Sequence, residues 1–152
     1  MGIRVGDRLP ARPDGRPWRA PGREGCPLVV FFYPRDFTSG CTREVCAFRD
    51  AHAELRELGA EIVGVSRDSE ERHAAFREAH GLSFPLVSDP DGRIGRAFGA
   101  AWLGGLVPLH KRKTYVADAE DLVRGIFHHE IRIARHVEEV RQLLKTLSAK
   151  SK

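Results

Sequence analysis

The chain has 152 residues, of which 41% are hydrophobic and 30% charged, and its formal net charge at pH 7 is +4. This length and composition predict one globular domain with an apolar core. No apolar stretch approaches the roughly 20 residues that cross a bilayer. A membrane-spanning protein is therefore disfavoured. The basic residues are scattered along the chain and form no stripe, so a nucleic-acid-binding protein is disfavoured as well.

The first part of the chain predicts a lead-in followed by a buried strand. Residues 1–25 are rich in Arg, Pro and Gly, which indicates an irregular or hairpin lead-in within a single domain spanning 1–152. They contain no apolar core of a signal peptide, so we expect a cytoplasmic protein. The apolar run 28–33, bracketed by prolines, is typical of a central strand.

Helical and strand-like patterns alternate after this strand. Residues 42–58 predict a helix that Gly59 ends, and residues 70–80 predict one that Asp68 or Ser69 caps and Gly81 ends. The remaining predicted elements are strands at 62–65, 85–88, 114–117 and 122–128, a short helix at 93–98, and a final amphipathic helix followed by a frayed tail at 148–152. This order predicts an α/β, thioredoxin-like fold with a central mixed β-sheet flanked by helices.

The segment 34–46, which reads P-R-D-F-T-S-G-C-T-R-E-V-C, carries the strongest functional signal. It places Cys41 at the first turn of a predicted helix, where exposed amides and a partial positive charge stabilise a thiolate. Gly40 lets the backbone approach a bound molecule, and Thr38 can place a hydroxyl beside the sulfur. With Pro34 screening the pocket from water, this pattern predicts a site for a small polar molecule beside a thiolate.

A second cysteine, Cys46, follows five residues after Cys41. On one regular helix their Cα atoms are roughly 8.6 Å apart, whereas Cα atoms joined by a disulfide are rarely more than about 6.8 Å apart. A bond between these cysteines therefore requires the first turns of the helix to unwind. A zinc site is an alternative, in which the two cysteines would bind the metal together with His128, His129 or His136. It is disfavoured because the C-x₄-C spacing is at the edge of the usual range.

The run 29–50 resembles the active-site segment of peroxiredoxins, in particular the bacterioferritin-comigratory (Q-type) subfamily. Pro34, Thr38 and Cys41 fall on the family's P-x-x-x-T-x-x-C motif. The similarity continues through 62–66, F-P-L-V-S-D at 84–89 and R-K-T-Y-V-A-D at 112–118. The resemblance implies a thiol-dependent peroxidase for hydrogen peroxide and organic hydroperoxides. It implies no metal or organic cofactor, and recycling by thioredoxin or a similar dithiol reductant; we expect a monomer.

The resemblance also implies roles for the residues of this segment. Cys41 would be the peroxidatic cysteine, which attacks a peroxide oxygen and becomes sulfenic acid. Cys46 would resolve it as an intramolecular disulfide. Thr38 would hydrogen-bond the peroxide, and Pro34 would shield the sulfur.

Two charged residues complete the site that the resemblance implies. Arg112 would hold the thiolate and polarise the peroxide, and Glu44 would orient Arg112. A thiolate requires a cationic partner, and the sequence pattern alone does not determine whether this partner is Arg112, Arg35 or Arg43. The pattern also leaves Glu44 open as a solvent-facing acid favoured by the helix dipole.

Two other functions stay open from the residues. One is a one-cysteine peroxidase in which Cys46 is an ordinary helix residue, and the other is a non-catalytic redox sensor or holdase. Three positions depart from the subfamily pattern: Ser39 replaces a frequent proline, the turn 118–121 lacks glycine, and Cys26 replaces a frequent lysine. Cys26 itself is interpreted as a small, passive residue.

Overall fold

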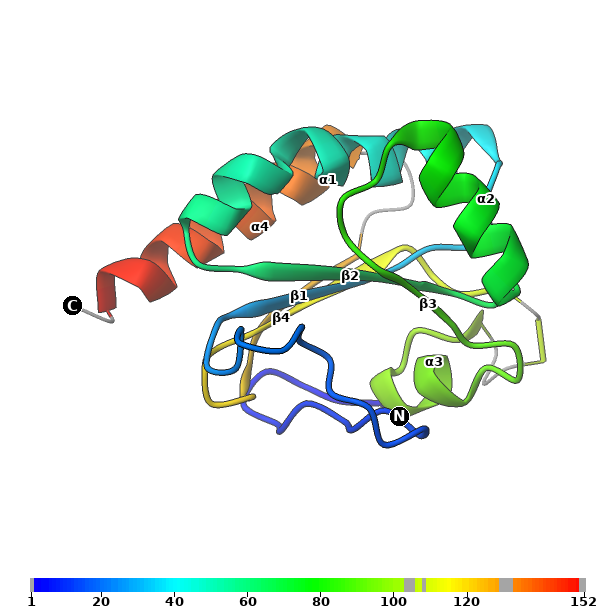
Figure 1. Cartoon of the computed structure of the whole chain (residues 1–152). Coiled ribbons are helices and arrows are strands. Elements are labelled where there is room, and N and C mark those ends of the chain that lie inside the picture. Colours follow the sequence, from blue (N-terminus) through cyan, green and yellow to red (C-terminus); the bar gives the residue numbers. More distant parts are fainter. Residues whose placement is uncertain (1, 103–105, 108, 129–132, 151–152) are drawn as a thin grey trace.

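The computed structural model describes residues 2–102, 106–107, 109–128 and 133–150, which form one mixed sheet with helices on both faces (Figure 1). The five strands are β1 (Leu28–Phe32), β2 (Glu61–Ser66), β3 (Leu86–Ser88), β4 (Lys113–Ala117) and β5 (Val123–His128). The helices are α1 (Ser39–Glu57), α2 (Glu70–His80), α3 (Arg93–Phe98) and α4 (Ile133–Lys150). No described helix is both long enough and apolar enough to cross a membrane.

The sheet has the strand order β3-β2-β1-β4-β5, with β1 at its centre. β1 is parallel to β2, and β2 is parallel to β3. β4 pairs antiparallel with β1 and β5 antiparallel with β4, so the late hairpin closes one side of the sheet. This topology confirms the predicted α/β fold and brings the end of β1 directly into the segment that carries Cys41.

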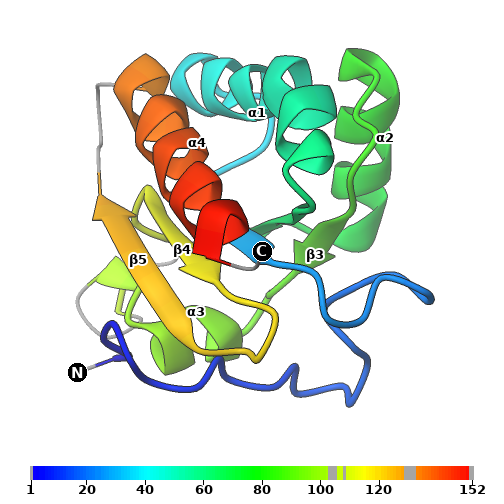
Figure 2. The same ribbon diagram turned by 90° about the vertical axis from the view of Figure 1, so that its left-hand side faces the viewer.

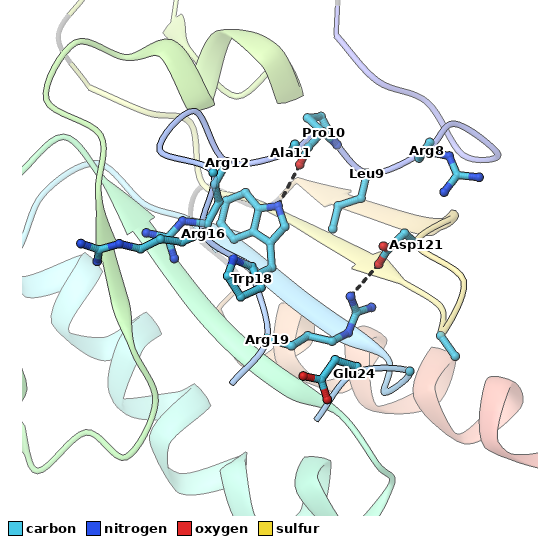
Figure 3. A pocket seen from close by; sticks show the side chains of 14 residues that line it. Arg8, Leu9, Pro10, Ala11, Arg12, Arg16, Trp18, Arg19, Glu24 and Asp121 are labelled. Carbon is cyan, nitrogen blue, oxygen red and sulfur yellow. Dashed lines mark hydrogen bonds and ion pairs between the residues drawn. The ribbon is translucent and has the colours of Figure 1, made fainter. Parts of the chain in front are cut away.

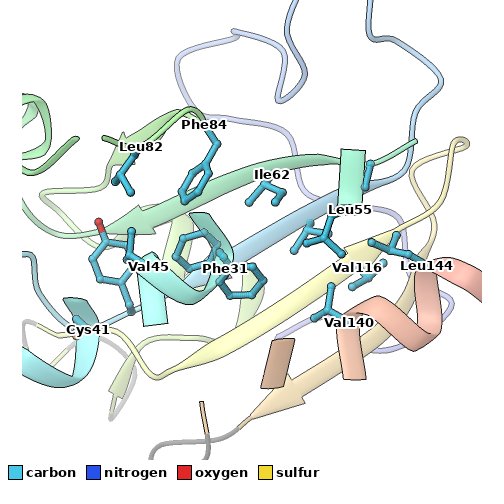
Figure 4. Packing of buried hydrophobic residues seen from close by; sticks show 14 of the residues in the cluster. Phe31, Cys41, Val45, Leu55, Ile62, Leu82, Phe84, Val116, Val140 and Leu144 are labelled. Atoms are coloured by element: carbon cyan, nitrogen blue, oxygen red, sulfur yellow. The ribbon is translucent and has the colours of Figure 1, made fainter. Parts of the chain in front are cut away.

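Each face of the sheet has its own apolar core. α1, α2 and α4 cover one face, and α3 with the N-terminal lead-in covers the other (Figures 1 and 2). Successive side chains of a strand point to opposite faces, so Phe31 packs under the three long helices and Phe32 packs on the α3 side. Figure 4 shows the first of these cores, in which Phe31 lies near Val45 and Phe84.

Most predicted boundaries agree with the structure to within one residue, and two differ by three residues. The Ser69 side chain accepts a hydrogen bond from the amide of Arg72 and caps α2, which ends at a left-handed Gly81. α1 begins at Ser39, three residues earlier than predicted, because the extended Thr38 serves as its N-cap and accepts the amide of Thr42. α4 extends to Lys150, so residues 148–150 are helical where the sequence predicts a frayed tail; no Gly or Pro in this stretch ends the helix.

The N-terminal lead-in is irregular and is attached to the β4–β5 turn. Arg19 donates hydrogen bonds to the Asp121 carboxylate at 2.6 Å and to the carbonyls of Cys26 and Asp118. Asp121 takes a left-handed backbone conformation (φ 65°), and the Asp118 carboxylate accepts the amide of Leu122. This turn therefore forms without the glycine that is usual at such a position.

Candidate active site

Cys41 lies at the amino end of α1, directly beyond the end of the central strand. It is the third residue of the helix, and its side chain is only 1% exposed. The thiol belongs to the core under the long helices, where Figure 4 places it close to the first turn of α1. The free amides of a first helical turn favour negative charge, so the fold puts this sulfur where a thiolate is stabilised.

Arg112 brings a guanidinium to this sulfur from a segment 71 residues away. Its Nη1 atom is 3.4 Å from the Cys41 Sγ atom and 3.5 Å from the Glu44 carboxylate. Both charged side chains are buried, which strengthens their interaction relative to a surface pair. A Cβ atom added at Gly40 would lie 3.2 Å from Arg112 Nη2, so the glycine makes room for the guanidinium.

The structure places Pro34 and Thr38 on the loop between β1 and α1. The Thr38 hydroxyl donates to the carbonyl of Arg35 at 2.9 Å, and the Thr38 side chain is exposed. Pro34 is half-buried directly after β1. The site residues brought together by described contacts are therefore Cys41, Glu44 and Arg112.

Cys46 lies further along α1 in different surroundings. Its half-buried sulfur is 3.8 Å from Nδ1 of His80, the last residue of α2. Arg49, one turn after Cys46, donates to the carbonyl of His80 at 2.8 Å. Both cysteines are free thiols on one continuous helix. In a regular helix they are too far apart for a disulfide, so a bond between them requires the helix to unwind.

A buried hydrogen-bond network holds the loop that precedes Cys41, and sequence reasoning missed it. Asp36 is fully buried; its carboxylate accepts from the Tyr33 hydroxyl at 2.5 Å and lies 2.6 Å from Nδ1 of His73 on α2. The other ring nitrogen of His73 is 3.1 Å from the carbonyl of Val87. Burial, and then the Asp36 carboxylate, raise the pKa of Tyr33 well above its ordinary value, so its hydroxyl stays a donor.

The same loop has a second attachment on its outer side. The Asp68 carboxylate accepts the backbone amide of Asp36 at 2.8 Å and pairs with Arg72 at 2.9 Å. Phe37 has a left-handed backbone (φ 64°), and its ring lies 5.0 Å from that of Phe76. A non-glycine residue in this conformation requires support from its surroundings, which α2 provides here.

Potential metal ligands of the described residues gather in this network and not around the cysteines. Asp36, Asp68 and His73 offer ligand atoms within 4.8 Å of one another, but each of these groups already takes part in hydrogen bonds. His136 contacts the Thr114 hydroxyl. His129 lies outside the described residues.

A cavity on the other face of the sheet is separate from the cysteine chemistry. It has a volume of about 460 Å³ and lies between the N-terminal lead-in and the β4–β5 turn (Figure 3). Trp18 and several arginines line it, and Arg12 and Arg19 are paired there with Asp14 and Asp121. It holds none of the residues predicted for catalysis.

Comparisons with known proteins place the chain among cysteine peroxidases. The model of the AhpC/TSA family matches residues 9–126. The chain is 38% identical over 135 residues to a chloroplastic peroxiredoxin Q from Sedum lineare, covering 88% of this chain and 72% of the relative. It is 37% identical to peroxiredoxin Bcp from Bacillus subtilis, covering 81% and 80% respectively. A chloroplastic peroxiredoxin Q from Populus jackii is longer, and the chain spans 62% of it.

A solved structure shows the same fold over nearly the whole chain. Peroxidoxin BcpB from Mycobacterium tuberculosis superimposes with a TM-score of 0.81 at 33% identity, covering 95% of this chain and 98% of that one. The chain therefore belongs to the AhpC/TSA family. Within this family it is similar to the peroxiredoxin Q and Bcp proteins, and it is a thiol-dependent peroxidase.

Proposed function

We propose that Cys41 is the peroxidatic cysteine and Cys46 the resolving cysteine of this peroxidase. The observation that carries the proposal is the 3.4 Å contact between the Arg112 guanidinium and the Cys41 sulfur at the first turn of α1. A thiolate, and not a thiol, is the nucleophile in such chemistry. A fixed cation and a helix amino end are the two features that hold a sulfur in that form.

In the first step the Cys41 thiolate attacks one peroxide oxygen. The S–O bond forms, the O–O bond breaks, and the leaving alkoxide or hydroxide takes a proton and departs as alcohol or water. We assign to Arg112 the stabilisation of the developing negative charge and to Glu44 the positioning of Arg112, since one guanidinium nitrogen lies near both partners. Thr38 would turn its hydroxyl from the Arg35 carbonyl toward the bound peroxide, and Pro34 would limit access of water.

In the second step Cys46 attacks the sulfur of the Cys41 sulfenic acid. The S–S bond forms, the S–O bond breaks, and water leaves. The two cysteines are on one intact helix in the reduced protein, so this step requires the first turns of α1 to unwind. Thioredoxin or a similar dithiol then reduces the disulfide and restores the helix.

The nature of the peroxide has support from one relative. The bacterioferritin comigratory protein of Xanthomonas campestris, a structural neighbour with a TM-score of 0.75 and 35% identity, is described with alkyl peroxide reduction activity. We extend that substrate class, with hydrogen peroxide, to this chain. The cytoplasmic location and the monomeric state stay predictions, and several relatives are chloroplastic.

The proposal is tested by turnover with a thioredoxin system and hydrogen peroxide or an alkyl hydroperoxide. Cys41→Ser should abolish peroxide reduction, and Cys46→Ser should abolish thioredoxin-dependent turnover while leaving the first oxidation intact. Cys26→Ser is the matched control and should turn over like the wild type. Full turnover by Cys46→Ser would indicate the one-cysteine mechanism, and stoichiometric mixed disulfides without turnover would indicate a redox sensor.

A further inference from the structure

The surroundings of Cys46 carry an inference that rests on the proposed function and goes beyond it. A resolving cysteine must lose its proton before it attacks, because a thiol with an ordinary pKa near 8.5 is mostly protonated at neutral pH. At Cys41 the guanidinium of Arg112 stabilises a thiolate but cannot accept a proton. At Cys46 the partner is an imidazole, which can do both.

We propose that His80 is the general base that activates Cys46 for the resolving step. Its Nδ1 atom is 3.8 Å from the Cys46 sulfur, within the range of a hydrogen bond to sulfur. Proton transfer from the thiol to Nδ1 leaves a thiolate and an imidazolium side by side. The thiolate then forms the S–S bond with Cys41 as the S–O bond breaks. The imidazolium returns the proton to the leaving hydroxide, so water departs and His80 is neutral again.

The position of His80 in α2 favours this role. It is the last residue of the helix, where the negative end of the helix dipole stabilises a cationic side chain. Its ring packs edge-on to Phe76 at 4.9 Å and lies 6.4 Å from the ring of Phe37, so two aromatic neighbours hold it. The imidazole is thereby fixed opposite Cys46.

Arg49 completes the surroundings of the Cys46 thiol. Its guanidinium holds the end of α2 against α1 through the carbonyl of His80. Its hydrogen bond to Asp50, and then the nearby Cys46 sulfur, raise the pKa of Arg49. A thiolate at Cys46 would thus face Arg49 as a second cation, on its own helix. The last turn of α2 contains one other basic residue besides His80, which is Arg77.

The test separates the two oxidation steps in one rapid-quench experiment. Reduced wild type, His80→Asn and the control Arg77→Gln receive one equivalent of hydrogen peroxide. Sulfenic acid is trapped with dimedone, and disulfide is counted by peptide mass spectrometry. Asparagine keeps a polar atom near the place of Nδ1 but accepts no proton. We expect His80→Asn to oxidise Cys41 within twofold of the wild-type rate and to form the Cys41–Cys46 bond at least tenfold more slowly.

A second measurement keeps the inference falsifiable if the His80 substitution loosens α2. In a Cys41→Ser background, iodoacetamide alkylation of Cys46 reports the fraction of thiolate without any disulfide chemistry. His80→Asn should slow this alkylation at pH 7, whereas mere loosening of the helix would expose Cys46 and speed it. Unslowed alkylation, or unslowed disulfide formation, overturns the role of His80. A wild type that forms no Cys41–Cys46 bond overturns the proposed resolving step itself, and this inference with it.

Discussion

The two cysteines of α1 sit in contrasting environments less than two turns apart. Cys41 is buried at the first turn and faces a guanidinium from β4's leading segment, with a buried carboxylate beside it. Cys46 is half-buried and faces an imidazole at the end of α2. The first environment suits a sulfur that is a thiolate at rest, and the second suits one that gives up its proton only when it is needed.

This difference fits the two steps that we propose for the cysteines of one helix. The contacts of Cys41 come from β4's side of the sheet, and those of Cys46 come from α2. Each thiol can therefore be perturbed through its own partner. The loop 33–38 is attached to α2 and supports both environments.

The largest effect is expected from Arg112→Met. Removing the guanidinium deprives the Cys41 thiolate and the transition state of their positive partner, so the rate of Cys41 oxidation should fall about 10²- to 10³-fold. Stopped-flow fluorescence with hydrogen peroxide measures this rate, and alkylation of Cys46 should be unaffected. Lys111→Met is the neighbouring control, because Lys111 lies over Trp102. A rate within threefold of wild type would remove Arg112 from the site.

Asp36→Ala should weaken the support that the two environments share. It leaves the Tyr33 hydroxyl and the His73 ring without their buried partner, at a cost of about 3 kcal/mol in the free energy of unfolding. Urea denaturation measures the loss. Tyr33→Phe, which removes one donor and leaves the His73 pair, should cost about 1 kcal/mol. Equal stability of Asp36→Ala and wild type would show that the network does not hold the loop.

A smaller effect is expected from the Asp89–His110 pair, which supports the segment leading to Arg112. Burial alone would raise the pKa of Asp89, but His110 and the amides of Ile94 and Gly95 outweigh it and lower the pKa below 3.8. The folded-state pKa is then below the unfolded one. The stabilisation is therefore fully present above about pH 5 and is lost as the pH falls through the lowered value.

Asp89→Asn checks this pH dependence. Thermal unfolding between pH 3 and pH 7 should show a shallower loss of stability on acidification in the variant than in the wild type. The peroxide rate at pH 7 should change less than in Arg112→Met, because the pair acts on Arg112 only through the backbone of residues 110–112. Identical acid slopes for the two proteins would contradict the lowered pKa.

The smallest effect is expected at an ion pair that belongs to neither environment. Glu138 on α4 pairs with Arg141 at 2.5 Å, and the hydrogen bonds from Arg141 and Gln142 lower the pKa of Glu138 to about 2. Both groups are solvent-accessible, so water screens the pair. Glu138→Gln should change the unfolding midpoint by about 2 °C or less and leave both oxidation steps unchanged. A loss of either step would show that α4 contributes to the site.

The fold was largely predictable because its signals are local. The apolar run 28–33 indicates a central strand, and Ser69 and Gly81 mark the ends of α2 through their own side-chain and backbone chemistry. The start of α1 was predicted three residues late. Thr38 caps this helix through its backbone alone, without the side-chain hydrogen bond of a typical N-cap. The same limit applies to α4, whose last residues lack a stop signal.

The site was predictable only where its residues are contiguous or resemble a known family. Residues 34–46 form one run, whereas Arg112 joins Cys41 across 71 residues and was found by resemblance. The pair of Asp36 and His73 and the pair of Cys46 and His80 join residues 37 and 34 positions apart. No periodicity links such partners, because the packing of α2 against the loop and α1 brings them together.

The order of events at the two thiols tests the account most directly. Reduced protein is mixed with one equivalent of hydrogen peroxide, quenched at times from milliseconds to seconds, and analysed by peptide mass spectrometry. We predict sulfenic acid on Cys41 first, then its conversion to a Cys41–Cys46 disulfide, with Cys26 unchanged throughout. Oxidation that begins at Cys46, or three thiols that persist unchanged, would contradict the division of roles between the two cysteines.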